Sequence, residues 1–234
     1  AAHINRATIE LATQAGYEVV IPSGGGCCGA LSLHMGNEDK ARALARANIA
    51  AWEAAGVDAV IVNASGCGVT VKDYDHLLRH DEDWAERAVR IAAGTRDVTE
   101  WLAEVELPPM RAPEPLTVAL HNPCTLQHGQ RILCAPRQLL EAAGFTVAEP
   151  AEPHLCCGAA GVYSILEPRL ARALRRRRTG HLEATGAHVV ASANLGCMQH
   201  LAGGTSLPVV HIVELLAWAA GGARPQALRT PQRV

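Results

Sequence analysis

The sequence predicts an α/β protein of two similar halves, each a small, mostly parallel sheet flanked by helices. Short apolar runs typical of strands alternate with longer stretches of helical periodicity. A Cys-Cys-Gly step occurs twice, as Cys27-Cys28-Gly29 and Cys156-Cys157-Gly158. A proline-rich segment lies between the two copies, so the pattern of the first half starts again in the second.

The first predicted domain spans residues 1–106. Asn5 suits the start of a helix that ends at Gly16, and the apolar run at 18–21 predicts a strand before the glycine-rich loop at 24–29. A long amphipathic helix is expected over 37–55. The elements predicted after it are a strand at 59–62 and helices at 69–79, 82–93 and 97–105.

A linker is predicted over 107–116, because four prolines within nine residues exclude a helix or a central strand. The second domain, 117–234, then repeats the strand and helix pattern. Its predicted strands are 117–120, 145–148 and 188–191, and its predicted helices are 134–143, 168–184 and 211–220.

The composition and charge of the chain argue against several classes of protein. A formal net charge of −2 argues against a general nucleic-acid binder, which needs a basic surface. No run of about 18 apolar residues occurs, and the first residues lack the pattern of a secretory signal, so we expect a soluble, cytoplasmic protein. With 234 residues the chain needs no disulfide framework to fold, and clustered cysteines in a reducing compartment are typically metal ligands or redox thiols.

The spacing of the cysteines supports the repeat. Between Cys28 and Cys67 lie 38 residues, and between Cys157 and Cys197 lie 39. In the second half a further cysteine, Cys124, precedes the Cys-Cys pair with 31 residues between them, and its counterpart in the first half would fall before the first residue. We therefore expect the first domain to be truncated at its N-terminal end.

The cysteines follow apolar strands and precede glycine-rich turns, the place where open α/β sheets gather functional groups. Adjacent cysteines point in different directions in an extended backbone, so a Cys-Cys pair suits a cluster of several metal ions better than one ion. Gly29 and Gly158 permit a tight backbone turn whose N–H groups can face sulfur.

Other residues near the cysteines are open to two interpretations. His200 follows Cys197 at the Cys-x-x-His spacing of a ligand. We interpret Cys134 as a small buried apolar residue of its helix. Three further histidines could donate hydrogen bonds to the site or be structural: His121, His128 and His154. The basic run at 175–178 predicts a solvated helix face, with a docking patch for a partner subunit as the alternative.

Four segments resemble the cysteine-rich CCG-domain family, whose pattern is a cysteine, Cys-Cys-Gly and Cys-x-x-Cys at spacings of thirty to forty residues. The segments are His121–Gln130, Leu155–Ser164, Ala193–Leu201 and Ala64–Tyr74. Within this family, which includes subunits of heterodisulfide reductase, glycerol-3-phosphate dehydrogenase and lactate-utilisation systems, they are most similar to iron–sulfur subunits of glycolate oxidase.

The resemblance implies an electron-transfer subunit of a complex that oxidises glycolate to glyoxylate. A flavin subunit would take the hydride, and iron–sulfur centres would pass electrons toward quinone, at the inner face of the cytoplasmic membrane. The ferredoxin-like Cys-x-x-Cys runs that precede these domains in the family do not occur in this sequence. The chain itself would not act on glycolate.

The last cysteine of the family pattern is replaced by Thr70 in the first copy and by His200 in the second. We therefore expect one [4Fe–4S]-type cluster, held in the second half by Cys124, Cys156, Cys157 and Cys197 with His200 as a further ligand or tuning residue. The candidate metal ligands of the first half are Cys27, Cys28 and Cys67, which are too few for such a cluster.

Three alternatives stay open. A structural zinc site would explain His200 but not the doubled Cys-Cys step. A thiol–disulfide enzyme would use a neighbouring cysteine pair as nucleophile and resolving thiol. The chain is also compatible with the equivalent subunit of a lactate or glycerol-3-phosphate dehydrogenase.

Overall fold

The computed structural model describes residues 2–229, and its second half is built on a four-stranded parallel sheet. The strands are β3 (Thr117–His121), β4 (Thr146–Ala148), β5 (Val189–Ser192) and β6 (Val209–His211), in the order β4-β3-β5-β6. Side chains alternate between the faces of β3: Val118 and Leu120 join the main core, whereas Ala119 packs on the opposite face beneath α10 (Pro168–Glu183).

The first half contains a smaller parallel sheet of two strands, β1 (Val60–Val62) and β2 (Thr95–Asp97). Its helices are α1 (Ala2–Gln14), α2 (Ala30–His34), α3 (Glu38–Ala54), α4 (Ser65–Lys72), α5 (Tyr74–Leu77), α6 (Ala85–Gly94) and α7 (Val98–Glu104). Asn37 caps α3, because its Oδ1 accepts a hydrogen bond from the N–H of Lys40 at 3.2 Å. The two parallel sheets confirm the predicted fold class.

The strand predicted at 18–21 is wrong. The segment is extended but unpaired, and Ile21 is 77% exposed. The corresponding run of the second half, β4, pairs with β3, and no described strand lies beside 18–21 to play that part. An apolar run becomes a strand only where a neighbour accepts its backbone hydrogen bonds.

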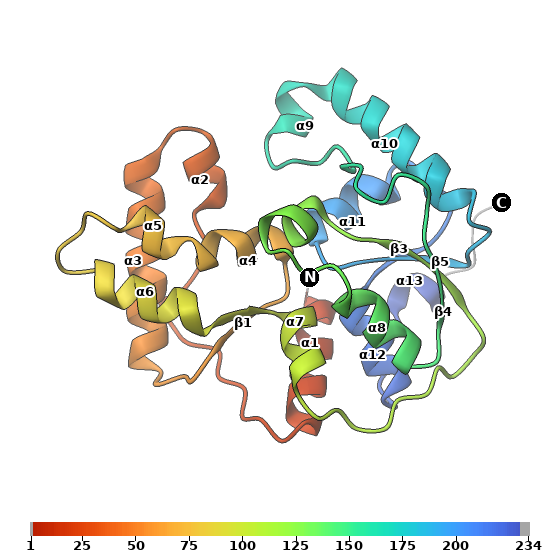
Figure 1. Ribbon diagram of the computed structural model, residues 1–234, viewed down its shortest axis with the longest axis horizontal. Helices are drawn as coiled ribbons and strands as arrows, with labels where there is room; N and C mark the ends of the chain where they lie inside the picture. The colour runs from red at the N-terminus through yellow and green to blue at the C-terminus, as the bar shows by residue number, and fades with distance from the viewer. Residues whose placement is uncertain (1, 230–234) are drawn as a thin grey trace.

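The largest hydrophobic core is formed by residues of both halves. Helices α1 and α7 of the first half pack against α12 (Ile212–Ala219) and α8 (Ala135–Ala142) of the second, respectively (Figure 1). Leu11 and Leu102 from the first half are buried with Leu140 and Leu216 from the second. The segment 107–116 has no regular structure, as predicted, but its N–H groups at Arg111 and Ala112 donate to carbonyls of the second half.

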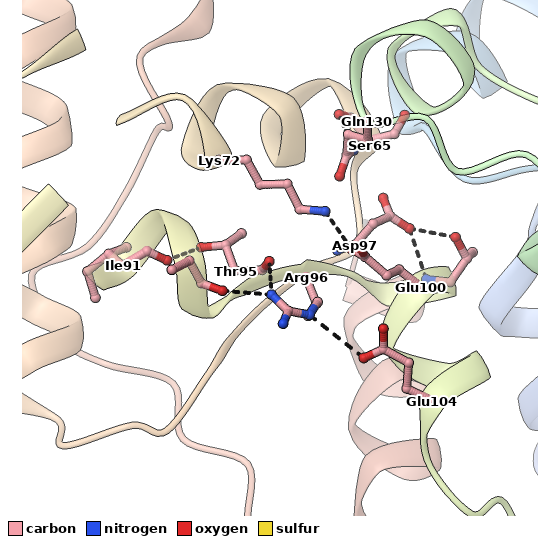
Figure 2. A network of polar contacts seen from close by, with 11 residues as sticks. Ser65, Lys72, Ile91, Thr95, Arg96, Asp97, Glu100, Glu104 and Gln130 are labelled. Carbon is pink, nitrogen blue, oxygen red and sulfur yellow. Dashed lines mark hydrogen bonds and ion pairs between the residues drawn. The ribbon is translucent and has the colours of Figure 1, made fainter. Parts of the chain in front are cut away.

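Polar contacts fix the helix α4 between β2, α7 and the second half (Figure 2). Asp97 caps α7 in a capping box with Glu100, and Lys72 of α4 forms an ion pair with Glu100. At the other end of α4, the side-chain amide of Gln130 donates to the carbonyl of Ser65 at 3.1 Å. This last hydrogen bond joins the start of α4, two residues before Cys67, to the second half.

Several short elements were not predicted from the sequence. They are α2, β2, β6, the π-helical turn η1 (Thr125–Gly129), α9 (Tyr163–Leu166), α11 (Leu195–Ala202) and α13 (Gln226–Arg229). The predicted burial of Cys134 is wrong, because this residue lies at the exposed N-cap of α8 rather than within the helix. No helix in the described part of the chain is both long and apolar enough to cross a membrane.

Candidate metal centre

The four cysteines predicted for the second half come together at the carboxyl end of the sheet. Cys124 follows β3, the pair Cys156 and Cys157 lies in the loop after β4, and Cys197 lies in the first turn of α11 after β5. Their side chains make a chain of hydrogen-bonding contacts from Cys124 to Cys156, from Cys156 to Cys157 and from Cys157 to Cys197. Three strand ends thus deliver four thiols to one place.

The contacts between these thiols separate their pKa values. Hydrogen bonds from Cys124 and Cys157 lower the pKa of Cys156, and a hydrogen bond from Cys157 lowers that of Cys197. The same contacts, together with burial, raise the pKa values of Cys124 and Cys157. Thiolates and thiols therefore alternate along the chain of contacts, and a metal centre that uses all four sulfurs must displace the remaining protons.

The Cys-Cys-Gly turn directs backbone N–H groups at sulfur, as its sequence predicts. The N–H of Gly158 donates to Cys156 Sγ at 3.3 Å, and the N–H of Ala159 donates to Cys157 Sγ at 3.5 Å. Gly158 adopts a φ of 93°, and a Cβ there would lie 2.5 Å from the carbonyl oxygen of Ala171. Both the turn and the close approach of α10 thus require glycine.

His121 also belongs to the site, although the sequence ranked it no higher than the other neighbouring histidines. It ends β3, is almost fully buried, and its ring lies with the thiols of Cys157 and Cys197 in a group whose ligand atoms are all within 4.8 Å of one another. The alternation of β3 could have indicated this, because His121 shares the face of Ala119 beneath α10.

Arg178 is the residue that sequence reasoning placed wrongly. It was predicted on a solvated face, but it is fully buried, and its Nε donates to His121 Nδ1 at 3.0 Å. The other members of the run differ: Arg176 is exposed, and Arg177 pairs with Glu152 at the surface. Arg178 continues the apolar stripe of α10 at helical spacing from Ala171 to Leu182, which is the signal that identifies its buried position.

His200 lies on α11 one turn after Cys197, with its Nε2 3.3 Å from the carbonyl oxygen of Ala171. It does not belong to the group formed by His121, Cys157 and Cys197, so its role as a ligand stays a prediction. His128 and His154 are exposed.

The cysteines of the first half form a smaller group. Cys28 and Cys67 contact each other, Cys27 lies beside Cys28, and the hydrogen bond from Cys67 lowers the pKa of Cys28 to about 6. The N–H of Gly29 donates to Cys27 Sγ at 3.5 Å, which repeats the turn of the second half. Thr70 replaces a fourth thiol, and its hydroxyl donates to the carbonyl of Gly66.

Asn48 and Tyr74 hold this first loop. Asn48 accepts from the N–H of Gly26 at 2.7 Å and donates to the carbonyl of Cys27 at 3.0 Å, while the hydroxyl of Tyr74 donates to the carbonyl of Cys28 at 2.9 Å. These hydrogen bonds fix the conformation of the loop. Metal binding by Cys27, Cys28 and Cys67 stays a prediction.

Comparison with known proteins confirms the family. The family described as "Cysteine-rich domain", CCG, matches residues 1–72 and 118–202, one segment in each half. The chain belongs to the cysteine-rich CCG family. Each matched segment contains one Cys-Cys-Gly turn and the cysteine that follows it after two helices and a strand.

Curated relatives in this family include iron–sulfur subunits. The chain is 36% identical over 218 residues to the glycolate oxidase iron-sulfur subunit of Escherichia coli (strain K12), covering 92% of the chain and 54% of that protein. It is 36% identical over 227 residues to the probable glycolate oxidase iron-sulfur subunit of Bacillus subtilis (strain 168), covering 93% and 51%. The chain thus spans about half the length of both relatives.

Two further comparisons bear on the family and the fold. Lactate utilization protein A of Exiguobacterium sp. is 28% identical over 220 residues, with 91% of the chain and 90% of that protein covered. A crystal structure of a hypothetical protein from Helicobacter pylori superimposes with a TM-score of 0.68 at 11% identity, covering 97% of the chain and 47% of that protein. The latter likeness concerns the fold alone.

Proposed function

We propose that the chain is an electron-transfer module of a glycolate-oxidising complex and that its second half holds one [4Fe–4S]-type cluster. The observation that carries this proposal is the convergence of four thiols, Cys124, Cys156, Cys157 and Cys197, at the carboxyl end of one sheet. Four cysteine thiolates are the usual ligand set of such a cluster, which supplies one-electron chemistry when bound.

The surroundings of the thiols fit this cofactor better than a single zinc ion. Two backbone N–H groups already face Cys156 and Cys157, and such hydrogen bonds to sulfur are a means by which proteins adjust cluster potentials. The site is partly open, because Cys124 and Cys156 are half-buried whereas Cys157 and Cys197 are buried. Electrons can therefore enter or leave on the side of Cys124 and Cys156.

The identity of the complex is proposed from the relatives. Glycolate oxidase subunits are the more similar of the curated proteins described above, which favours a flavin-containing partner that oxidises glycolate and passes electrons through this chain toward quinone. The similarity to lactate utilization protein A makes lactate the second candidate donor. We place the chain in the cytoplasm, attached through its partners to the inner face of the cytoplasmic membrane, which fractionation of cells would test.

The cluster assignment is tested by iron and sulfide analysis of anaerobically purified protein. We expect about four irons and four sulfides per chain, loss of most of this iron in Cys156→Ser, and no loss in the control Cys134→Ser, whose thiol is exposed at the N-cap of α8. One zinc without sulfide would favour the structural zinc site, and a metal-free protein with reactive vicinal thiols would favour the thiol–disulfide enzyme.

Iron analysis also tests whether the first half binds metal. Because the first half offers only three thiols, Cys27→Ser and Cys67→Ser should leave the iron content unchanged. A loss of about half the iron in either variant would show that the first half holds a centre of its own.

A further inference from the structure

We infer that His121 donates a hydrogen bond to the Cys197 sulfur rather than binding metal, and that Arg178 is the positioning residue that keeps it in this role. The inference deepens the proposed function and rests on it for its effect on a cluster. Neither residue belongs to the cysteine pattern that identified the site in the sequence.

The first step is the hydrogen-bond pattern of the His121 ring. Its Nδ1 lies 3.0 Å from Nε of Arg178. Its Nε2 is buried and has no hydrogen-bond partner within residues 2–229, and the ligand atoms of the ring and of the Cys157 and Cys197 thiols lie within 4.8 Å of one another. A guanidinium is always protonated and can only donate, so Nδ1 must be the accepting nitrogen. In the neutral ring the hydrogen then lies on Nε2, a tautomer assigned from this hydrogen-bond network.

The second step is the comparison with a metal-bound histidine. Such a histidine offers a lone pair to the metal and donates its other ring N–H to a carboxylate, a carbonyl or water. His121 has the reverse arrangement. Arg178 donates to its Nδ1, whereas the corresponding nitrogen of a metal-bound histidine would itself donate to an acceptor. The compact group of His121, Cys157 and Cys197 therefore has the spacing of a metal site but the wrong hydrogen-bond direction for ligation by the ring.

The third step is what holds Arg178 in place. The residue is fully buried, and its Nη1 donates to the carbonyl of Glu152 at 2.8 Å. No ion pair joins it to a carboxylate within residues 2–229. Burial lowers the pKa of Arg178, whereas negative charge at Cys157 and Cys197 and at Glu149 and Glu152 favours its protonated form. A buried cation of this kind requires compensating negative charge, which the Cys197 thiolate and these carboxylates provide.

The two halves differ at this position. Arg178 precedes Cys197 by the same number of residues as Asn48 precedes Cys67, and both are buried in the long helix beside the Cys-Cys-Gly loop. Within residues 2–229 the side chain of Asn48 forms hydrogen bonds with the loop and Tyr74, whereas that of Arg178 forms them with the loop and His121. The positive charge thus belongs to the half that has four thiols. Together with the hydrogen bond from His121 it favours the more negative, reduced state of a cluster.

The test combines substitution with iron analysis and a redox titration followed by EPR. In His121→Leu we expect unchanged iron content and a midpoint potential below that of the wild type, because a donor to sulfur is lost while four ligands remain. His121→Gln should recover part of the shift through its amide N–H, and Arg178→Met should shift the potential in the same direction. His80→Leu, at an exposed position of the first half, is the matched control and should leave the potential unchanged.

Loss of iron in His121→Leu from a folded protein, or an unchanged potential, would overturn the inference. A second measurement uses the unsubstituted chain, so its result does not depend on whether the variants fold. ¹⁵N NMR of histidine-labelled, metal-free, reduced protein at mildly alkaline pH should show Nε2 as the protonated nitrogen of His121. Protonation of Nδ1 would contradict the inference. Because this experiment needs no iron, it decides the role of His121 even if the chain proves to hold no cluster.

Discussion

At the scale of single residues, the sequence revealed the candidate thiols of the site but not the groups that surround them. The duplicated turn was enough to predict the part played by Gly29 and Gly158, because a left-handed turn beside sulfur has a local sequence signature. The pairing of Arg178 with His121 joins positions 57 residues apart and depends on how α10 lies over β3, which no local pattern encodes.

Replacement of Gly158 by alanine should damage the site. Its φ of 93° is strained for any other residue, and the new Cβ would lie 2.5 Å from backbone of α10, so we expect a loss of roughly 1–3 kcal/mol in unfolding free energy and lower iron content. Gly180→Ala in the same helix, where a Cβ has open space, is the control and should retain both. Urea unfolding with iron analysis measures the two effects, and full iron binding in Gly158→Ala would contradict this account.

At the scale of elements, long helices were predicted within a few residues, whereas short strands depended on their neighbours. The strands β2 and β6 each have only three residues and run directly into the helices α7 and α12. Strand β2, Thr-Arg-Asp, has no apolar residue to indicate it, and the two valines of β6 merge with the apolar pattern of α12. The predicted strand at 18–21 failed for the opposite reason, since its apolar pattern is clear but it has no partner among the described strands. Pairing is a property of the sheet and not of the segment.

The junction of β6 and α12 predicts a pH dependence of stability. His211 caps α12 and is fully buried. Burial lowers its pKa to about 4, although the carbonyls of Ala193 and Asn63 favour the protonated ring. An unfolded histidine titrates near pH 6.5. Below about pH 6.5 the unfolded chain therefore binds a proton that the folded chain does not, and stability falls until the pH reaches about 4.

Between about pH 7 and pH 5, we expect this residue alone to reduce the unfolding free energy by about 2 kcal/mol. His211→Asn retains a cap for α12 without a titrating ring and should flatten the dependence. Urea unfolding followed by tryptophan fluorescence, with both proteins in a Cys156→Ser background so that cluster loss does not contribute, measures the difference. Equal slopes for the two proteins would show that other groups cause the pH dependence.

At the scale of the whole molecule, the repeat was visible in the sequence but the way its copies associate was not. The division into 1–106, 107–116 and 117–234 follows the repeat, and it stays a prediction. The structure adds that α1 and α7 complete the core of the second half (Figure 1). Such contacts arise from the apolar faces of helices in both copies, and the sequence pattern shows those faces without showing their partners.

The shared core predicts that a substitution in the first half weakens the sheet of the second. Leu102 of α7 is 1% exposed in the core that both halves form, whereas Leu78 is equally buried in a core made of first-half residues. Each replacement by alanine should cost about 2–5 kcal/mol. Amide hydrogen exchange should then show faster exchange of the β5 amides in Leu102→Ala, whereas Leu78→Ala should affect chiefly α3 and α5. If β5 keeps its protection in Leu102→Ala, the halves are energetically independent, and residues 117–234 would be expected to fold and bind iron alone.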